Sequence, residues 1–135
     1  MSTVKYYDWS YHQARTRPNK VAVKEVSTGR ETTYGQLEER SCRLASWLQN
    51  KGVKKGDRVA ILIHNCTEVF ELEFACAKIG AIELPLNWRL TKPELEYILN
   101  DSSPEVLIYG SNFADTAKAL TLSLIHISEP TRRRT

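Results

Sequence analysis

Apolar and polar positions alternate between strand-like and helix-like spacing through the middle of the chain. Residues 59–63 (VAILI) form an apolar run without alternation, which is typical of a strand covered on both faces. A helical stretch over residues 67–79 follows, and Gly80 is placed to end it in the left-handed conformation. A second short apolar run lies at residues 81–86. The order predicted here is strand, helix, strand.

Capping signals predict where two more helices begin. Thr33 is followed three residues later by Gln36, and Thr91 is followed by Glu94, so each threonine can form a capping box. The first of these helices carries a stripe that should face the core, made of Leu37, Ser41, Leu44, Ala45 and Leu48. Gly52 is expected to stop that helix.

The N-terminal part predicts a helix and a hairpin. Residues 6–17 can form a short helix that ends before a proline. Residues 21–26 alternate as a half-buried strand does, and residues 31–33 return as the second arm after a turn at 27–30.

The last part of the pattern is a strand at residues 106–109 and a helix from Asn112 through Leu120. Strands that alternate with helices over short connections imply a mainly parallel sheet. We therefore predict an α/β fold: a partial N-terminal subdomain with a mainly parallel sheet, preceded by a short helix and a β-hairpin.

The composition is typical of a globular protein and indicates no particular function. The 135 residues are 41% hydrophobic and 26% charged, which fits one globular domain. No apolar run approaches the length of about 18 residues that a membrane span needs, and the first residues lack the apolar core of a secretory signal. We expect no membrane span and a cytoplasmic location.

The net charge of +3 gives little support to a nucleic-acid partner. Arg132, Arg133 and Arg134 against Glu129 account for +2 of it, which leaves +1 for residues 1–121. We expect no nucleic-acid binding.

The cysteines and histidines do not form a recognisable metal or catalytic pattern. Cys76 lies in an apolar helical stretch and is expected to be a buried thiol. The remaining candidates are widely spaced: Cys42, Cys66, His12, His64 and His126. We assign no catalytic, cofactor-binding or metal-binding residue to this chain.

Three stretches of the chain together form a recognisable set of motifs. They are residues 32–37 (TTYGQL), residues 56–60 (GDRVA) with Asn65, and residues 76–81 (CAKIGA) followed by PLNWRL at 85–90. In this order they resemble the motifs of the adenylate-forming (AMP-binding) ligases, and in particular of their acyl-CoA synthetase branch. The first differs from the usual family motif by Gln36 in place of Glu. The residues in these motifs are mostly caps and turns, so their roles are expected to be structural.

The resemblance implies an intact enzyme that joins a carboxylic acid to ATP and then passes the acyl group to coenzyme A, with magnesium on the phosphates. Such an enzyme needs a Gly/Ser/Thr-rich phosphate loop with a lysine. The closest string in this chain is Ser27-Thr28-Gly29-Arg30, which we interpret as a turn only. We therefore expect residues 1–121 to be a partial N-terminal region that binds no ATP, CoA or magnesium by itself. The acid and the oligomeric state stay open.

Residues 122–132 (LSLIHISEPTR) resemble translated sequencing-adapter DNA and no protein family. We therefore treat residues 122–135 as a non-native tail. A basic tail that binds nucleic acid or an acidic membrane is the rival interpretation.

Two function hypotheses follow. In the first, the chain is an inactive N-terminal fragment of an acyl-CoA synthetase. In the second, it is a short ligase-derived α/β module that acts as a binding or interaction domain. Because partner elements would be missing from a fragment, apolar faces at residues 59–63 and 81–86 are expected to be exposed.

Overall fold

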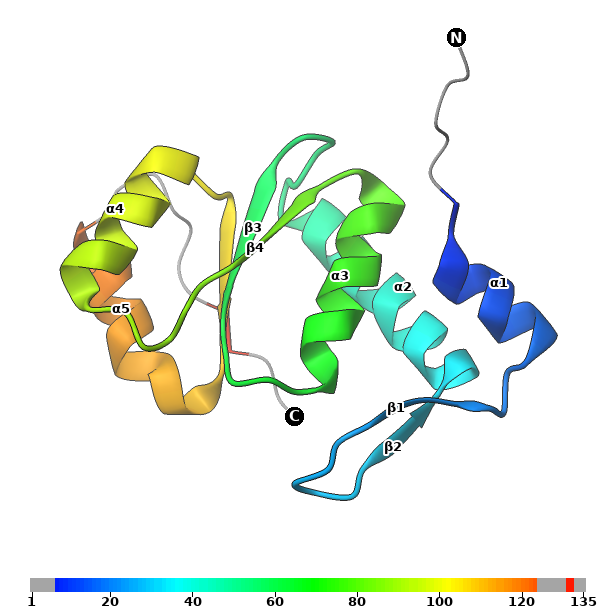
Figure 1. Cartoon of the computed structure of the whole chain (residues 1–135). Coiled ribbons are helices and arrows are strands. Elements are labelled where there is room, and N and C mark those ends of the chain that lie inside the picture. Colours follow the sequence, from blue (N-terminus) through cyan, green and yellow to red (C-terminus); the bar gives the residue numbers. More distant parts are fainter. Residues whose placement is uncertain (1–6, 124–130, 133–135) are drawn as a thin grey trace, which may run out of the picture.

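The centre of the chain is a parallel sheet with helices on both of its faces (Figure 1). The computed structural model describes residues 7–123 and 131–132. The strands lie in the order β4-β3-β5-β6, and each neighbouring pair is parallel. Their bounds are Arg58–Leu62 (β3), Ile82–Pro85 (β4), Val106–Tyr109 (β5) and Thr131–Arg132 (β6). The predicted α/β class and mainly parallel sheet are confirmed.

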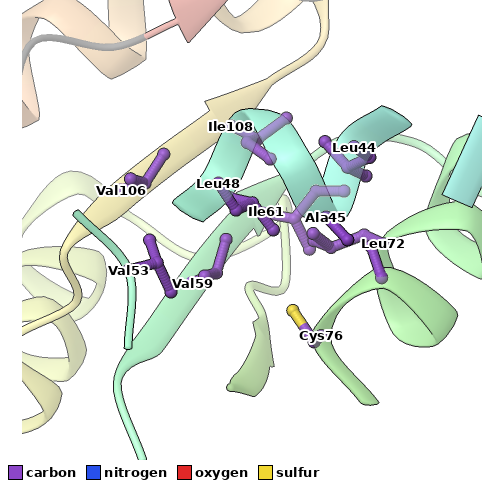
Figure 2. Close-up of a cluster of buried hydrophobic side chains, with 11 residues drawn as sticks. Leu44, Ala45, Leu48, Val53, Val59, Ile61, Leu72, Cys76, Val106 and Ile108 are labelled. Carbon is purple, nitrogen blue, oxygen red and sulfur yellow. The ribbon is translucent and has the colours of Figure 1, made fainter. Parts of the chain in front are cut away.

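Two layers of helices cover the sheet. Their bounds are Tyr34–Asn50 (α2), Thr67–Ile79 (α3), Lys92–Ser102 (α4) and Ala114–Ser123 (α5), with a 3-10 turn at Ser111–Phe113 before α5. On one face α2 and α3 pack against Val59 and Ile61 of β3 (Figure 2). On the other face α4 and α5 pack against Ala60 and Leu62. Successive side chains of β3 therefore point to opposite faces and belong to two separate hydrophobic clusters.

Because helices cover both faces of the sheet, one of our expectations is wrong. We expected residues 59–63 to present an uncovered apolar face, but Val59, Ala60 and Leu62 are fully buried and Ile61 is 3% exposed. The chain supplies helices for both faces itself, so β3 needs no further element. Strand β4 is the outer strand of the sheet, and Ile82 on it is 52% exposed.

The N-terminal elements lie on the far side of α2. Helix α1 spans Trp9–Thr16, and strands β1 (Val21–Lys24) and β2 (Glu31–Thr33) form an antiparallel hairpin, as predicted. Figure 1 shows α1 and the hairpin packed beside α2, away from the parallel sheet.

The predicted helix signals are present in the structure. Thr33 and Gln36 form a capping box at the start of α2, and Thr91 and Glu94 form one at the start of α4. The buried residues of α2 are the predicted stripe: Leu37, Ser41, Leu44, Ala45 and Leu48. Gly80 ends α3 with φ of 74°. Among the described residues, no helix is both long and apolar enough to cross a membrane.

Candidate functional site at the carboxyl end of the sheet

The carboxyl ends of β3 and β5 form a topological switch point. These strands are neighbours, yet the helix after β3 packs on one face of the sheet and the helix after β5 packs on the other. The two connections therefore separate at this edge. In open α/β sheets, ligands bind in the crevice that such a separation leaves.

Three aromatic rings meet at this edge, each from a different strand connection. His64 follows β3, Trp88 follows β4, and Phe113 follows β5. The ring centroids of His64 and Trp88 are 4.5 Å apart, and those of His64 and Phe113 are 5.0 Å apart and nearly stacked. Since the carboxyl ends of parallel strands share one edge, residues far apart in the sequence come together here.

A guanidinium and a tight loop complete the aromatic edge. The guanidinium carbon of Arg89 lies 4.4 Å from the ring centroid of Trp88, and the backbone amide of Arg89 donates to Oδ1 of Asn87 at 3.0 Å. Gly110 donates its amide to the carbonyl of Leu62. A Cβ on Gly110 would lie 3.1 Å from Cγ1 of Ile63, so a glycine lets the two loops approach closely.

This edge offers flat stacking faces and one cation, which together suit a planar or anionic group. Within residues 7–123 Arg89 has no acidic partner, and its guanidinium stacks on the neighbouring Trp88. The side chain of the motif residue Asn87 accepts this hydrogen bond from its local backbone, as Asn often does in a turn. Within residues 7–123 and 131–132, no three His, Cys, Asp or Glu side chains gather where they could hold a metal ion.

The string that comes closest to a phosphate loop is a closed hairpin turn. In residues 27–30 the amide of Gly29 donates to the carbonyl of Glu25, and the amide of Arg30 donates to Oγ1 of Thr28. The guanidinium of Arg30 pairs with Glu25 at 3.1 Å and with Glu68 at 3.0 Å. The turn is therefore engaged within the chain and does not fit a bound phosphate.

Sequence reasoning missed a buried ionic network around that arginine. Glu68 and Glu71 of α3 are 1% and 0% exposed, and Arg30 and Arg40 reach them from the hairpin and from α2. Burial alone would raise the pKa of Glu68, but hydrogen bonds from Cys66, from the backbone and from Arg30 outweigh it and lower the pKa. The network fastens the hairpin and α2 to α3, and we assign it a structural role.

A second ionic cluster holds α1 in place. The ammonium of Lys78 lies 2.7 Å from Asp8 and 2.8 Å from Glu38. Oγ of Ser10 donates to Glu38 at 2.7 Å. These contacts join α1, α2 and α3, and all of their charges are paired.

The cysteines are not placed for chemistry. Cys76 is 2% exposed, as predicted, and burial followed by the charge of Glu83 raises its pKa to about 12. Burial and a hydrogen bond to Glu68 raise the pKa of Cys66 to about 11. Both thiols therefore stay protonated and weakly nucleophilic near neutral pH. Among the other candidates, Cys42 is exposed and His12 lies on α1, whereas His126, Glu129, Arg133 and Arg134 lie outside the described residues.

A parallel sheet with helices on both faces defines this chain as an α/β protein. Residues 10–134 match the AMP-binding enzyme family, and the chain belongs to that family. It is 43% identical over 112 residues to the feruloyl-CoA synthase of an Amycolatopsis species, covering 83% of this chain and 22% of that protein. It is 39% identical over 118 residues to the long-chain-fatty-acid–CoA ligase FadD13 of Mycobacterium tuberculosis, covering 87% of this chain and 24% of that protein.

A solved structure shows the same fold. The chain superposes on a fatty acyl CoA synthetase of Mycobacterium tuberculosis with a TM-score of 0.84 and 34% identity, covering 93% of this chain and 26% of that one. The chain thus spans about a quarter of the length of the relatives it matches. The predicted resemblance to acyl-CoA ligases is confirmed.

Proposed function

We propose that this chain is the N-terminal region of an ATP-dependent acyl-CoA synthetase and is inactive alone. The intact enzyme would convert a carboxylic acid, ATP and CoA into acyl-CoA, AMP and pyrophosphate. The observation that carries the proposal is the continuous match to acyl-CoA ligases over about a quarter of their length. The carboxylic acid that the intact enzyme would use is not defined, because the relatives include a feruloyl-CoA synthase and a long-chain-fatty-acid–CoA ligase.

The described residues support the proposal that the chain is inactive alone. The turn at residues 27–30 is closed by its own hydrogen bonds and by Glu68, so it is not available to cradle a phosphate. Within the part of the chain that the structure describes, no cluster of three His, Cys, Asp or Glu side chains is placed to hold magnesium. At the aromatic carboxyl edge the cation that contacts the rings is the guanidinium of Arg89, which stacks on Trp88.

The proposal also divides the chain after residue 121 into a ligase part and a tail. We infer that residues 1–121 are ligase sequence and that residues 122–135 derive from adapter DNA, because LSLIHISEPTR resembles such a translation. The family match extends to residue 134, so this division rests on that resemblance alone. Helix α5 runs through Leu122 to Ser123, and the two-residue strand β6 lies beside β5. A cytoplasmic location also remains part of the proposal.

A second candidate function is favoured by one observation. The sheet is covered on both faces by helices of this chain, and its two hydrophobic clusters are closed. A ligase-derived module that folds alone and binds a partner is therefore structurally possible. A concentration-independent, cooperative melt of a monomer would support this second function.

The test is ATP–pyrophosphate exchange by the purified 135-residue chain, with fatty, aromatic and branched acids supplied in turn. We expect no exchange above a blank purification, while a complete acyl-CoA ligase in the same assay exchanges readily. Exchange that follows the chain through purification would overturn the claim of inactivity.

A further inference from the structure

A continuous apolar groove runs between the hairpin and α3. Its first part has a volume of about 530 Å³ and is lined by β1, by α1 and by Phe70 and Phe74 of α3. Its second part has a volume of about 580 Å³ and is lined by residues 23–27 of the hairpin and by Phe70. Val23, Lys24 and Phe70 line both parts, so the two parts join into one groove along β1.

The groove meets β1 along the backbone edge of the strand. Residues 22–24 line the first part of the groove and residues 23–27 line the second, although successive side chains of a strand point to opposite faces. A wall made of consecutive residues is therefore the edge of the strand and not one of its faces. Among the described residues β1 pairs with β2 alone, so this edge has no neighbouring strand.

The register of the hairpin leaves hydrogen-bonding groups on this edge. The amide of Glu25 donates to the carbonyl of Arg30 at 2.8 Å, so these two residues form a hydrogen-bonded pair. The next pair along the ladder is Lys24 and Glu31, and hydrogen-bonded and non-hydrogen-bonded pairs alternate between antiparallel strands. The amide and the carbonyl of Lys24 therefore point away from β2, toward the position of an additional strand.

Polar contacts hold the hairpin at a fixed spacing from α3. The hydroxyl of Thr67 donates to Glu25 at 3.2 Å, and the guanidinium of Arg30 pairs with Glu68 at 3.0 Å. Figure 1 shows the hairpin beside the N-terminal end of α3. A free strand edge that borders an apolar groove is the arrangement in which proteins bind an extended peptide by β-strand addition.

The side chains and charges around the groove select the residues of such a peptide. Phe70 is 45% exposed and Val26 is 93% exposed, so apolar side chains of an added strand have partners here. Residues 9–24 contain four basic residues and no Asp or Glu. Lys20 precedes β1 and Lys24 ends it, and both are exposed. This charge favours acidic residues between the apolar ones.

We propose that the free edge of β1 binds an extended segment of another protein, in which apolar residues alternate with acidic ones. The backbone of the segment pairs with the outward amide and carbonyl of Lys24, and its apolar side chains enter the groove against Phe70. Main-chain pairing gives affinity in this mode of binding, and the groove gives specificity for alternate side chains. The inference rests on the second candidate function, the binding module, and not on ligase activity.

The test is fluorescence polarisation of a labelled octapeptide, EVEFEVEF, titrated with the 135-residue chain. We expect saturable binding that added salt weakens, because salt screens the charges. Two further peptides are N-methylated, one at the odd and one at the even positions. Only one edge of the bound strand faces β1, so one methylated peptide should bind at least about tenfold more weakly than the other.

Variants of the chain separate the backbone, the charge and the groove. Lys24→Pro removes the outward amide without removing a hydrogen bond to β2, and it should weaken binding about tenfold or more. Lys24→Gln keeps the amide and removes only the charge, so it should weaken binding less than Lys24→Pro does. Phe70→Ser should also weaken binding. Tyr97→Ser, which removes a 73% exposed ring on α4, is the matched control and should bind like the parent chain.

The proposal is overturned if the unmethylated peptide does not bind, or if the two methylated peptides bind equally. A dimer of the chain that Lys24→Pro dissociates would also overturn it, because a second copy would then occupy the edge. So would a longer product of the same gene that no longer binds the peptide, because a later segment of that protein would then fill the groove. A cooperative melt of a monomer that binds no peptide rejects this partner and leaves the binding-module function standing.

Discussion

The guanidinium of Arg40 in α2 pairs with the carboxylate of Glu71 in α3, a side chain with no exposed surface. The two residues are 31 positions apart in the sequence. A second carboxylate, that of Glu68, lies 3.8 Å from Arg40. One arginine therefore faces two buried carboxylates and links the two helices that cover one face of the sheet.

Removing that arginine should strongly destabilise the chain. Arg40→Ala leaves Glu71 buried without this cation, and we expect a loss of about 2–4 kcal/mol in the free energy of unfolding. Urea denaturation measures it. Arg43→Ala, on the same helix, breaks the exposed pair with Glu39 and should cost less than about 0.5 kcal/mol. If both variants lose the same free energy of unfolding, the buried pair contributes no more to stability than the exposed pair does.

The end of α3 depends on glycine for two separate reasons. Gly80 has φ of 74°, and a Cβ there would lie 2.9 Å from Cγ of Lys55. Gly29 in the hairpin turn has the same φ of 74° but open space around it. We expect Gly29→Ala to cost about 1 kcal/mol from backbone strain alone and Gly80→Ala to cost more. Thermal denaturation of the two variants separates the close contact from the strain, and a smaller loss at Gly80 would contradict this reading.

Glu83 on the outer strand β4 should lower the free energy of unfolding as the pH rises. Burial, followed by the nearby charge of Glu73, raises the pKa of Glu83 to about 7, and its Oε1 has no hydrogen-bond partner among the described residues. A carboxyl whose pKa is higher in the folded than in the unfolded chain binds more protons when folded. Stability from this group is therefore full below the unfolded pKa and is lost as the pH rises to about 7.

Glu83→Gln tests this pH dependence. Because the side chain is only half-buried, we expect the variant to gain about 1–2 kcal/mol relative to the parent near pH 8 and little near pH 5. Glu105→Gln, at an exposed position just before β5, is the control and should not change the pH profile. A pH profile that Glu83→Gln leaves unchanged would rule out Glu83 as the responsible group.

Local signals predicted the elements of this fold well because their causes are local. The capping pair Thr33 and Gln36 acts within one helical turn, and it fixed the start of α2. The apolar run at residues 59–63 correctly indicated a strand buried on both faces. The family resemblance rested on the same local motifs, which is why it was visible in a short chain.

The long-range relationships could not be predicted in the same way. Glu68 and Glu71 read as ordinary polar positions of α3, because the arginines that pair with them lie 38 and 31 residues earlier. The aromatic edge joins residues 64, 88 and 113 only because β4 and β5 lie on opposite sides of β3. We also expected β3 to be uncovered because a fragment would lack the covering elements, and the local pattern does not show that α2, α3, α4 and α5 cover both faces.

The central claim is that this chain is the N-terminal region of a longer acyl-CoA synthetase. Amplifying and sequencing the source DNA across the codon for Leu122 tests it most directly. We expect the reading frame to continue past Leu120 into a Gly/Ser/Thr-rich loop with a lysine. A genome that instead encodes LSLIHISEPTRRRT followed by a stop codon would contradict the claim and leave the small binding module as the function to pursue.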